Sequence, residues 1–334
     1  MKKRRKILLI IFLILAFVQL VILGYLFYLN LPGSQKIDFG VTFSPSQAKY
    51  LGVEPEKVLE ASLNDLNIKK YRISAYWNVV EKQLGVFDFS DIDWQINMIE
   101  KANGEIILAI GRRLPRWPEC HDPEWLGNLS EQKVQQKTLA LLEKTIEKYK
   151  NRNSIVAWQV ENEPLLSIFG ECPKPDKNFY KSEVDLVRKL DPTRPIVVTE
   201  SGELSTWLNG AIYGDMVGIS VYRTTWDKIF GFFYYPLTPS YYKHKARMLT
   251  PLVKNIFVSE LQAEPWERTP LPETPLLEQK FFMNPDKLDQ SVDFVRRAGF
   301  NDVYLWGVEW WYWLLDKQND PSMWLKVKEL VKNK

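Results

Sequence analysis

The stretch Ile155–Pro164 reads Ile-Val-Ala-Trp-Gln-Val-Glu-Asn-Glu-Pro, and the fold and chemistry expected of the chain both follow from it. Its first part is rich in β-branched and aromatic residues, which is typical of a buried strand. Pro164 lacks an amide hydrogen and restricts the residue before it, so the strand should end there. This places the carboxylate of Glu163 at the C-terminal end of a strand, where parallel α/β proteins have their active sites. An isolated Asn-Glu-Pro also fits an ordinary exposed turn, so the rest of the chain has to decide.

From residue 37 onward, short apolar strands alternate with amphipathic helices such as Glu54–Asn67, Glu131–Tyr149 and Pro321–Lys332. Eight strand–helix units without a second composition regime predict the α/β class and a single (β/α)8 TIM barrel over residues 37–334. A doubly wound sheet is the alternative, but no Gly-rich phosphate loop follows any strand. The predicted strands are Ile37–Phe43, Lys69–Ala75, Ile106–Ile110, the strand from Ile155, Pro195–Thr199, Met216–Val221, Ile256–Glu260 and Val303–Gly307.

The amino terminus has the pattern of a membrane anchor. Met1–Lys6 carries five Lys/Arg, and Ile7–Leu29 then gives 23 residues without a charge. At ~1.5 Å per residue this run could cross a ~30 Å hydrocarbon core, and it is too long for the apolar region of a signal peptide. A buried core helix is the alternative. We therefore predict a cytoplasmic tail and transmembrane helix in residues 1–30, a bilayer as partner through residues 7–29, a linker in 31–36 and an extracytoplasmic catalytic domain.

Charge and composition exclude several classes of function. The formal charge is +3, and without the five basic residues of the tail the remainder has 39 basic against 41 acidic side chains. Such a chain lacks the basic surface that nucleic-acid binding requires. With His121 and His244 as its only histidines, a multi-histidine metal site is excluded and a Ser-His-Asp triad is disfavoured, so we expect no metal and no cofactor. Cys120 and Cys172 lie in proline-flanked loops and are either a disulfide or two free thiols.

In a barrel of this kind the residues that end each strand face one another across one rim. The fourth and seventh predicted strands both end in a carboxylate, on opposite sides of the barrel mouth. A glycosidase needs such a pair, one acid and one base or nucleophile flanking the scissile bond. The strand-end residues are Arg72, Asn162, Glu163, Glu200, Tyr222, Glu260 and Trp306.

Three motifs resemble the clan A glycoside hydrolases, the large group of retaining (β/α)8 enzymes. Trp158–Pro164 resembles their acid/base strand, and Val258-Ser259-Glu260 resembles their nucleophile strand. Tyr71–Asn78, continued by Glu81 and Gly85–Asp93, looks like the corresponding stretch of cellulase-like and β-galactosidase-like members. The resemblance covers about residues 37–330. Each motif is short, but their order and their placement on the expected strands make the combination specific.

The resemblance implies a role for each matching residue. Glu163 would be the general acid/base and Glu260 the nucleophile, with their carboxyl groups ~5–5.5 Å apart as in retaining enzymes. Asn162 would bind the 2-hydroxyl group of the sugar, and Tyr222 would hydrogen-bond to the nucleophile. Arg72 would lie beside Glu260 as a cation, although an ordinary barrel ion pair is the alternative for this residue.

Other candidate substrate contacts have stronger structural alternatives. Trp306 would form the apolar floor below the reacting sugar, but Trp306 and Tyr222 also fit plain core aromatics. Trp77 in the second-strand motif is a further substrate-binding candidate. Glu200 and His121 could contact the sugar or serve only to hold their loops.

Two more carboxylates lie near the same strand ends, and both rank below the chosen pair. Glu161 precedes the Asn-Glu pair, and Glu264 lies beyond its strand in a Pro-Trp loop. Aromatic residues crowd the upper loops, where rings can stack on the C–H faces of sugars. The run 230–235 could instead dip into a bilayer interface. The loop aromatics are Trp117, Trp125, Trp226, Phe230, Phe232, Phe233, Tyr234, Tyr235, Trp266, Trp310, Trp311 and Trp313.

The sequence therefore predicts a monomeric, membrane-anchored retaining glycosidase that acts on a β-linked oligo- or polysaccharide outside the cell. A catalytically inactive barrel that binds carbohydrate or a partner protein is the alternative from another class. A transglycosylase would use the same two carboxylates and differ only in what attacks the intermediate. The sequence does not choose among sugars.

Overall fold

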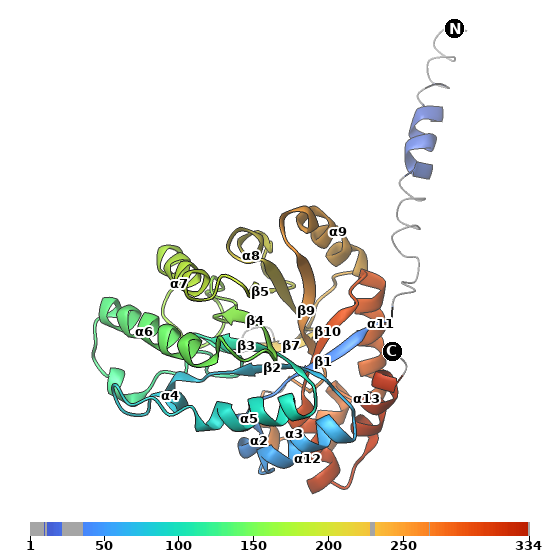
Figure 1. Ribbon diagram of the computed structural model, residues 1–334. Coiled ribbons are helices and arrows are strands. Elements are labelled where there is room, and N and C mark those ends of the chain that lie inside the picture. The colour runs from blue at the N-terminus through green and yellow to red at the C-terminus, as the bar shows by residue number, and fades with distance from the viewer. Residues whose placement is uncertain (1–9, 11, 22–35, 228–230, 267, 333–334) are drawn as a thin grey trace.

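The computed structural model describes residues 10, 12–21, 36–227, 231–266 and 268–332. Within these residues, eight parallel strands close a barrel in the order β1-β10-β9-β6-β5-β4-β3-β2, which confirms the predicted TIM barrel. Helices surround the barrel on its outside (Figure 1). The barrel strands are β1 (Asp38–Thr42), β2 (Lys70–Ser74), β3 (Glu105–Ile110), β4 (Ile155–Val160), β5 (Ile196–Ser201), β6 (Met216–Val221), β9 (Asn255–Gln262) and β10 (Asp302–Trp306).

The helices that return the chain between strands agree closely with the apolar periodicity of the sequence. Several begin at residues that suit helix starts: Asp176 and Asn284 accept amide hydrogens of the first turn, and proline opens α3, α9 and α11. The helices of the barrel body are α2 (Pro45–Tyr50), α3 (Pro55–Asn64), α4 (Trp77–Val80), α5 (Ser90–Lys101), α6 (Glu131–Tyr149), α7 (Lys177–Leu190), α8 (Leu208–Tyr213), α9 (Pro239–Leu249), α10 (Leu276–Phe282), α11 (Pro285–Ala298), α12 (Val308–Lys317) and α13 (Ser322–Lys332).

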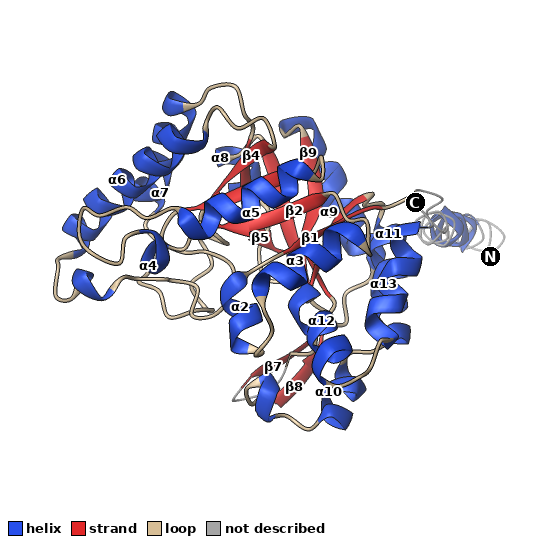
Figure 2. Cartoon of the chain, turned by 60° about the horizontal axis from the view of Figure 1, so that its bottom comes forward, coloured by secondary structure: helices blue, strands red, loops and turns tan. Residues whose placement is uncertain are grey.

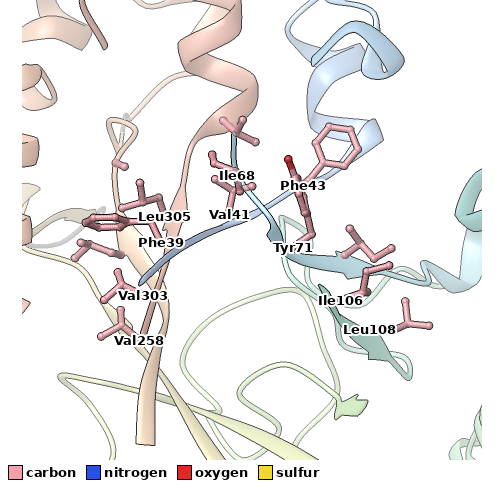
Figure 3. Packing of buried hydrophobic residues seen from close by; sticks show 14 of the residues in the cluster. Phe39, Val41, Phe43, Ile68, Tyr71, Ile106, Leu108, Val258, Val303 and Leu305 are labelled. Carbon is pink, nitrogen blue, oxygen red and sulfur yellow. The ribbon is translucent and has the colours of Figure 1, made fainter. Parts of the chain in front are cut away.

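Residues that alternate along the barrel strands belong to two different buried clusters. The larger cluster lies between the strands and the helices and includes Val41, Leu108 and Leu305, all fully buried (Figure 3). A smaller cluster contains strand residues of the opposite parity, which point into the barrel: Ile107, Ala157, Val197, Phe257 and Tyr304. Because the side-chain period of a strand is two residues, inward positions nearer the C-terminal ends reach the rim where an active site forms.

A bulge in β9 changes the direction of the strand near its carboxylate. β6 pairs Ile219 with Val258 but Ser220 with Glu260, so one extra residue of β9 lies between two consecutive partners. Such bulges re-aim side chains beside active sites. Gly218 of β6 accommodates the bulge, since a Cβ atom there would lie 2.8 Å from the Cβ atom of Ser259.

The two strands that follow β6 were not predicted from the sequence. The aromatic run after β6 forms a two-stranded antiparallel hairpin, β7 (Thr224–Asp227) and β8 (Gly231–Tyr234), with Phe230 outside the described residues. Figure 2 shows the hairpin beside α10, and the rings of Phe232 and Phe282 stack at 3.9 Å. The hairpin is thus tied to the outer helices by aromatic packing.

The predicted transmembrane span Ile7–Leu29 needs correction. The structure describes residue 10 and residues 12–21 of this span, all helical, and the remainder lies outside the described residues. In the part of the chain that the structure describes, no helix is long and apolar enough to cross a membrane. This finding overturns the predicted single-pass localisation and leaves the bilayer contact through residues 7–29 unsupported. The boundaries 1–30 and 31–36 stay predictions.

Candidate active site

The end of β4 turns sharply to present its polar residues. Glu161 and Glu163 have φ values of 59° and 44°, in the left-handed region that residues other than glycine rarely adopt. The amide of Glu163 donates to Thr199 Oγ1 at 2.8 Å, and Ser220 Oγ donates to Glu163 Oε1 at 2.8 Å. Desolvation, followed by the neighbouring charge of Glu260, raises the pKa of Glu163 to about 7. A carboxyl group of this pKa can both give and take a proton near neutral pH.

Glu260, in the bulged part of β9, is held by two groups from other strands. Its Oε1 atom accepts from Arg72 Nη1 at 2.6 Å, and its Oε2 atom accepts from Tyr222 Oη at 2.9 Å. Arg72 is fully buried and Glu260 nearly so. Charge-assisted bonds of this kind fix the carboxylate in position. The structure thus brings together Arg72, Tyr222 and Glu260, as the strand-end pattern predicts.

Asn162 is the centre of a second group of hydrogen bonds. Its Oδ1 atom accepts from Arg72 Nη2 at 2.7 Å and from Thr199 Oγ1 at 3.2 Å. Its Nδ2 atom donates to Glu119 Oε2 at 3.0 Å. Gln159 accepts from Arg72 Nε at 2.6 Å, so the arginine connects Asn162, Gln159 and Glu260. The side-chain amide of Asn162 is therefore held in one orientation.

Trp306 is the last residue of β10, and its surroundings are more polar than expected. Its indole Nε1 donates to Glu264 Oε1 at 2.8 Å, and the Arg116 guanidinium lies 4.0 Å from the ring centroid. Arg116 also bonds to Glu309 at 2.8 Å, and burial raises the pKa of that carboxyl to about 7. Trp306 is 8% exposed. The carboxyl group of Glu264, which ranked below the chosen pair, therefore accepts hydrogen bonds from Arg116 and Trp306.

Three predicted substrate contacts have their partners away from Glu163 and Glu260. Glu200 accepts the amide of Gly210 in α8 at 2.9 Å. Trp77 is fully buried and donates to Glu81 at 2.8 Å. His121 packs against Tyr76, with ring centroids 4.3 Å apart, and burial lowers its pKa. Each of these side chains has a structural partner in its own neighbourhood.

Glu161, the other carboxylate ranked below the chosen pair, also has its own hydrogen-bond partners. Its carboxyl accepts the amides of Arg112 and Arg113 and hydrogen-bonds to Glu183 of α7. Desolvation raises the pKa values of both Glu161 and Glu183. Glu161 thus anchors the turn that follows β4.

The loops after β3 and β4 are covalently joined. Cys120 and Cys172 form a disulfide with an S–S distance of 2.09 Å, the first of the two alternatives that the sequence allows. Arg113 supports the same junction by donating to the carbonyl oxygens of Leu166 and Phe169, at 2.7 and 2.8 Å. The two loops therefore behave as one unit beside Asn162 and Glu163.

Two of the predicted loop aromatics belong to a series of rings that leads away from Glu260. Trp117, Phe169, Trp266 and Tyr222 form a continuous series of ring contacts at 5.2–5.9 Å, from the partner of Glu260 outward to Trp117, which is 61% exposed. Three others correct the sequence interpretation, because they belong to the core of α12 and not to the upper loops. These are Trp310, Trp311 and Trp313.

Sequence reasoning missed four neighbours of the site. Thr199 and Ser220 lie near the C-terminal ends of β5 and β6, and the inward parity of Val197 on β5 would have identified Thr199. Glu119 lies nine residues beyond β3, where no strand pattern points to it. Glu203 accepts the amide of Tyr222 at 3.1 Å, and burial raises its pKa to about 7. Among the described residues, no group of three or more His, Cys, Asp or Glu side chains could hold a metal ion.

The chain is similar to glycoside hydrolases in sequence. It matches the family described as glycosyl hydrolases family 2, TIM barrel domain, over residues 61–245, more than half of its length. It is 28% identical to a β-glucuronidase of Rattus norvegicus over 100 residues, which are 30% of this chain and 14% of that protein. The chain thus spans only a small part of this curated relative.

Solved structures share the fold at low identity. A β-galactosidase from a Rahnella species has a TM-score of 0.57 at 12% identity, covering 91% of this chain and 56% of that one. A GH5_18 protein of Bifidobacterium longum in complex with Manβ1-4GlcNAc has a TM-score of 0.61 at 13% identity, covering 89% and 78%. Xylanase 10B of Thermotoga petrophila, in complex with xylobiose, has a TM-score of 0.56 at 11% identity, covering 91% and 95%. At these identities the likeness shows the fold alone.

Proposed function

Because the chain belongs to the family of glycosyl hydrolases family 2 TIM barrel domains, we propose that it hydrolyses a β-linked oligo- or polysaccharide by a retaining double displacement. The observation that carries this proposal is the pairing of Glu163 and Glu260 at the ends of β4 and β9. Desolvation and then the charge of Glu260 raise the pKa of Glu163, and Arg72 and Tyr222 both hydrogen-bond to the Glu260 carboxyl group. One group is thus equipped to give a proton and the other to attack.

In the first step, a Glu260 oxygen attacks the anomeric carbon while Glu163 gives its proton to the departing glycosidic oxygen. The bond to the leaving group breaks as the ester bond to Glu260 forms. Tyr222 and Arg72 keep the attacking oxygens oriented. Asn162, held by Arg72 and Thr199, offers its remaining amide hydrogen to the 2-hydroxyl group.

In the second step, Glu163 takes a proton from water, and the water oxygen attacks the anomeric carbon. The ester bond to Glu260 breaks, its carboxylate is restored, and the product keeps the original β configuration. Once Glu260 is esterified its negative charge is gone, so the pKa of Glu163 falls and this carboxylate becomes available as a base. A transglycosylase differs only in using a sugar hydroxyl in place of water.

The proposal is tested by screening the chain against a panel of aryl β-glycosides of glucose, galactose, mannose, xylose and glucuronic acid. On a substrate that is turned over, Glu260→Ala should lower kcat by at least about 10⁴-fold, since the nucleophile is lost. Added azide should restore part of the rate and give the inverted product, as measured by NMR of the anomeric proton.

Glu163→Ala should spare the first step for substrates with good leaving groups, because these need no proton. The second step stays slow, so a covalent sugar should accumulate on Glu260 and be located by mass spectrometry of peptides. A label on Glu264 or Glu203 would refute the assignment, and Glu278→Ala on the outer helix α10 serves as the control variant. A chain that binds glycans but turns over none of the panel would support the inactive barrel instead.

A further inference from the structure

The backbone of Glu119 is held in a conformation that is unusual for a residue with a side chain. Its φ value is 73°, in the left-handed region, where a residue with a side chain is strained. Its amide donates to the carbonyl of Arg116 at 2.8 Å, and its carbonyl accepts the amide of Leu114 at 2.8 Å. Backbone strain of this kind persists only where the surroundings enforce it.

The neighbouring loop is shaped around Glu119. Gly170 has φ +85°, and a Cβ atom there would lie 2.8 Å from the Cβ atom of Glu119. The next residue, Glu171, donates its amide to the carbonyl of Pro118 at 2.9 Å. The disulfide joins the residues immediately beyond, Cys120 and Cys172. The loops after β3 and β4 are thereby linked to each other on both sides of Glu119.

The carboxyl group itself contacts the site. Oε2 accepts from Asn162 Nδ2 at 3.0 Å and lies 3.6 Å from Arg113 Nε. Both Glu163 and Glu260 are near enough for their charges to raise the pKa of Glu119, after the larger effect of burial, to about 8. The side chain is 5% exposed. The charged and titratable groups that face it are therefore Arg113 from its own loop, Glu163 from the end of β4 and Glu260 from β9.

Of the two side-chain amide hydrogens of Asn162, one bonds to Glu119, and this bond fixes the direction of the other. Oδ1 is taken by Arg72 and Thr199, and one N–H is taken by Glu119. We propose that Glu119 is a positioning residue of the active site, which holds Asn162 so that its second N–H meets the 2-hydroxyl group of the reacting sugar. The substrate class is accordingly a glycoside with a free hydroxyl at C2, an inference that rests on the proposed glycosidase function.

The test compares two substrates in four proteins. The substrates are the aryl β-glycoside found in the panel and its 2-deoxy analogue, and the proteins are the wild type, Glu119→Ala, Glu119→Gln and Glu124→Ala. Glu119→Ala should lose about 30-fold in kcat/KM on the hydroxyl substrate and less than about threefold on the 2-deoxy analogue. Glu119→Gln can still accept the Asn162 amide hydrogen and should stay within about threefold of the wild type. Glu124, an exposed residue of the same loop, is the control.

An equal loss on both substrates in Glu119→Ala would overturn the inference, because a merely structural role does not distinguish them. A second measurement needs no turnover. The side-chain amide signal of Asn162, followed by NMR from pH 5 to 9, should shift with a midpoint near 8 in the wild type and lose that step in Glu119→Gln. An Asn162 amide signal that stays unchanged in Glu119→Ala would also overturn it, because Glu119 would then not hold that amide. If no glycoside is cleaved but the step is present, the proposed function fails while the positioning of Asn162 stands.

Discussion

At the residue scale, the pKa of Glu163 sets the working range of the site. Desolvation and the charge of Glu260 raise it to about 7, so the group is protonated below that pH and ionised above it. In the proposed mechanism, the first step needs the protonated form. We therefore expect kcat/KM to fall about tenfold per pH unit above pH 7 for substrates with poor leaving groups.

The measurement is a pH profile of kcat/KM with an alkyl and a dinitrophenyl glycoside. The alkyl substrate should show the alkaline limb in the wild type, and Glu163→Gln should abolish its turnover. The dinitrophenyl substrate, whose departure needs no proton, should show no such limb, and Glu163→Gln should retain its first step. The profile of Asp286→Asn, at the start of the outer helix α11, should match the wild type. An alkaline limb of the same size with both substrates in the wild type would assign that pKa to another group.

The predicted site residues that the structure brings together share one property, which is the inward parity of a strand end. Arg72 and Tyr222 both hydrogen-bond to Glu260, because their strands bring these side chains to the same rim. Glu200 also ends a strand, but Thr199 takes the inward position, so the glutamate faces α8 instead. Strand alternation, applied residue by residue, would have separated these two.

At the element scale, α7 is joined to the end of β4 by two buried carboxyl groups. Glu183 of α7 hydrogen-bonds to Glu161, and desolvation raises both pKa values. The folded state therefore holds more protons than the unfolded chain at pH values above ~4.3, the ordinary glutamate value. The free energy of unfolding should fall as the pH rises from there through the folded-state pKa values.

Glu183→Gln removes one titrating group and keeps a donor for Glu161. We expect it to raise the free energy of unfolding by on the order of 1–2 kcal/mol at pH 8 and to have little effect at pH 5. Urea unfolding at the two pH values measures the difference. Asp185→Asn on the exposed side of the same helix is the matched control. Equal effects at both pH values would show that the carboxyl pair does not share its proton in this way.

Elements with a clear period were predicted from sequence, and those that depend on tertiary packing were not. The eight strands and the long helices have apolar residues at regular spacing. α12 is apolar nearly all round, with five residues of its ten, Val308, Trp310, Trp311, Trp313 and Leu314, in the buried core. Such a segment is indistinguishable from an aromatic binding loop until its neighbours are known. The β7–β8 hairpin was missed for the same reason.

At the scale of the whole molecule, closure of the barrel brings the first strand to the last. β1 pairs with β10 from Asp38↔Asp302 to Thr42↔Trp306. No local signal encodes contacts between such distant residues, and the closure was predicted only because eight strand–helix units were counted. The expected monomer stays a prediction.

Lys70 supports this seam at the end of the barrel opposite the site. Its Nζ atom lies 2.6 Å from Asp302 of β10 and 3.3 Å from Asp38 of β1, so one cation from β2 bridges the strands on both sides of the closure. Without it, two carboxylates in register would repel each other across the seam. We expect Lys70→Met to lower the free energy of unfolding by about 1–2 kcal/mol at pH 7, a modest value because the aspartates are partly exposed.

At pH 3.5 the loss should shrink, since protonation of the aspartates removes their repulsion. Urea unfolding at the two pH values, with Lys69→Met as the control, gives both numbers. The double variant Lys70→Met with Asp302→Asn should recover part of the stability at pH 7, because only one carboxylate then remains beside the neutral side chain. If the loss were the same at both pH values and the second substitution recovered nothing, the packing of the lysine stem, and not its charge, would hold the seam.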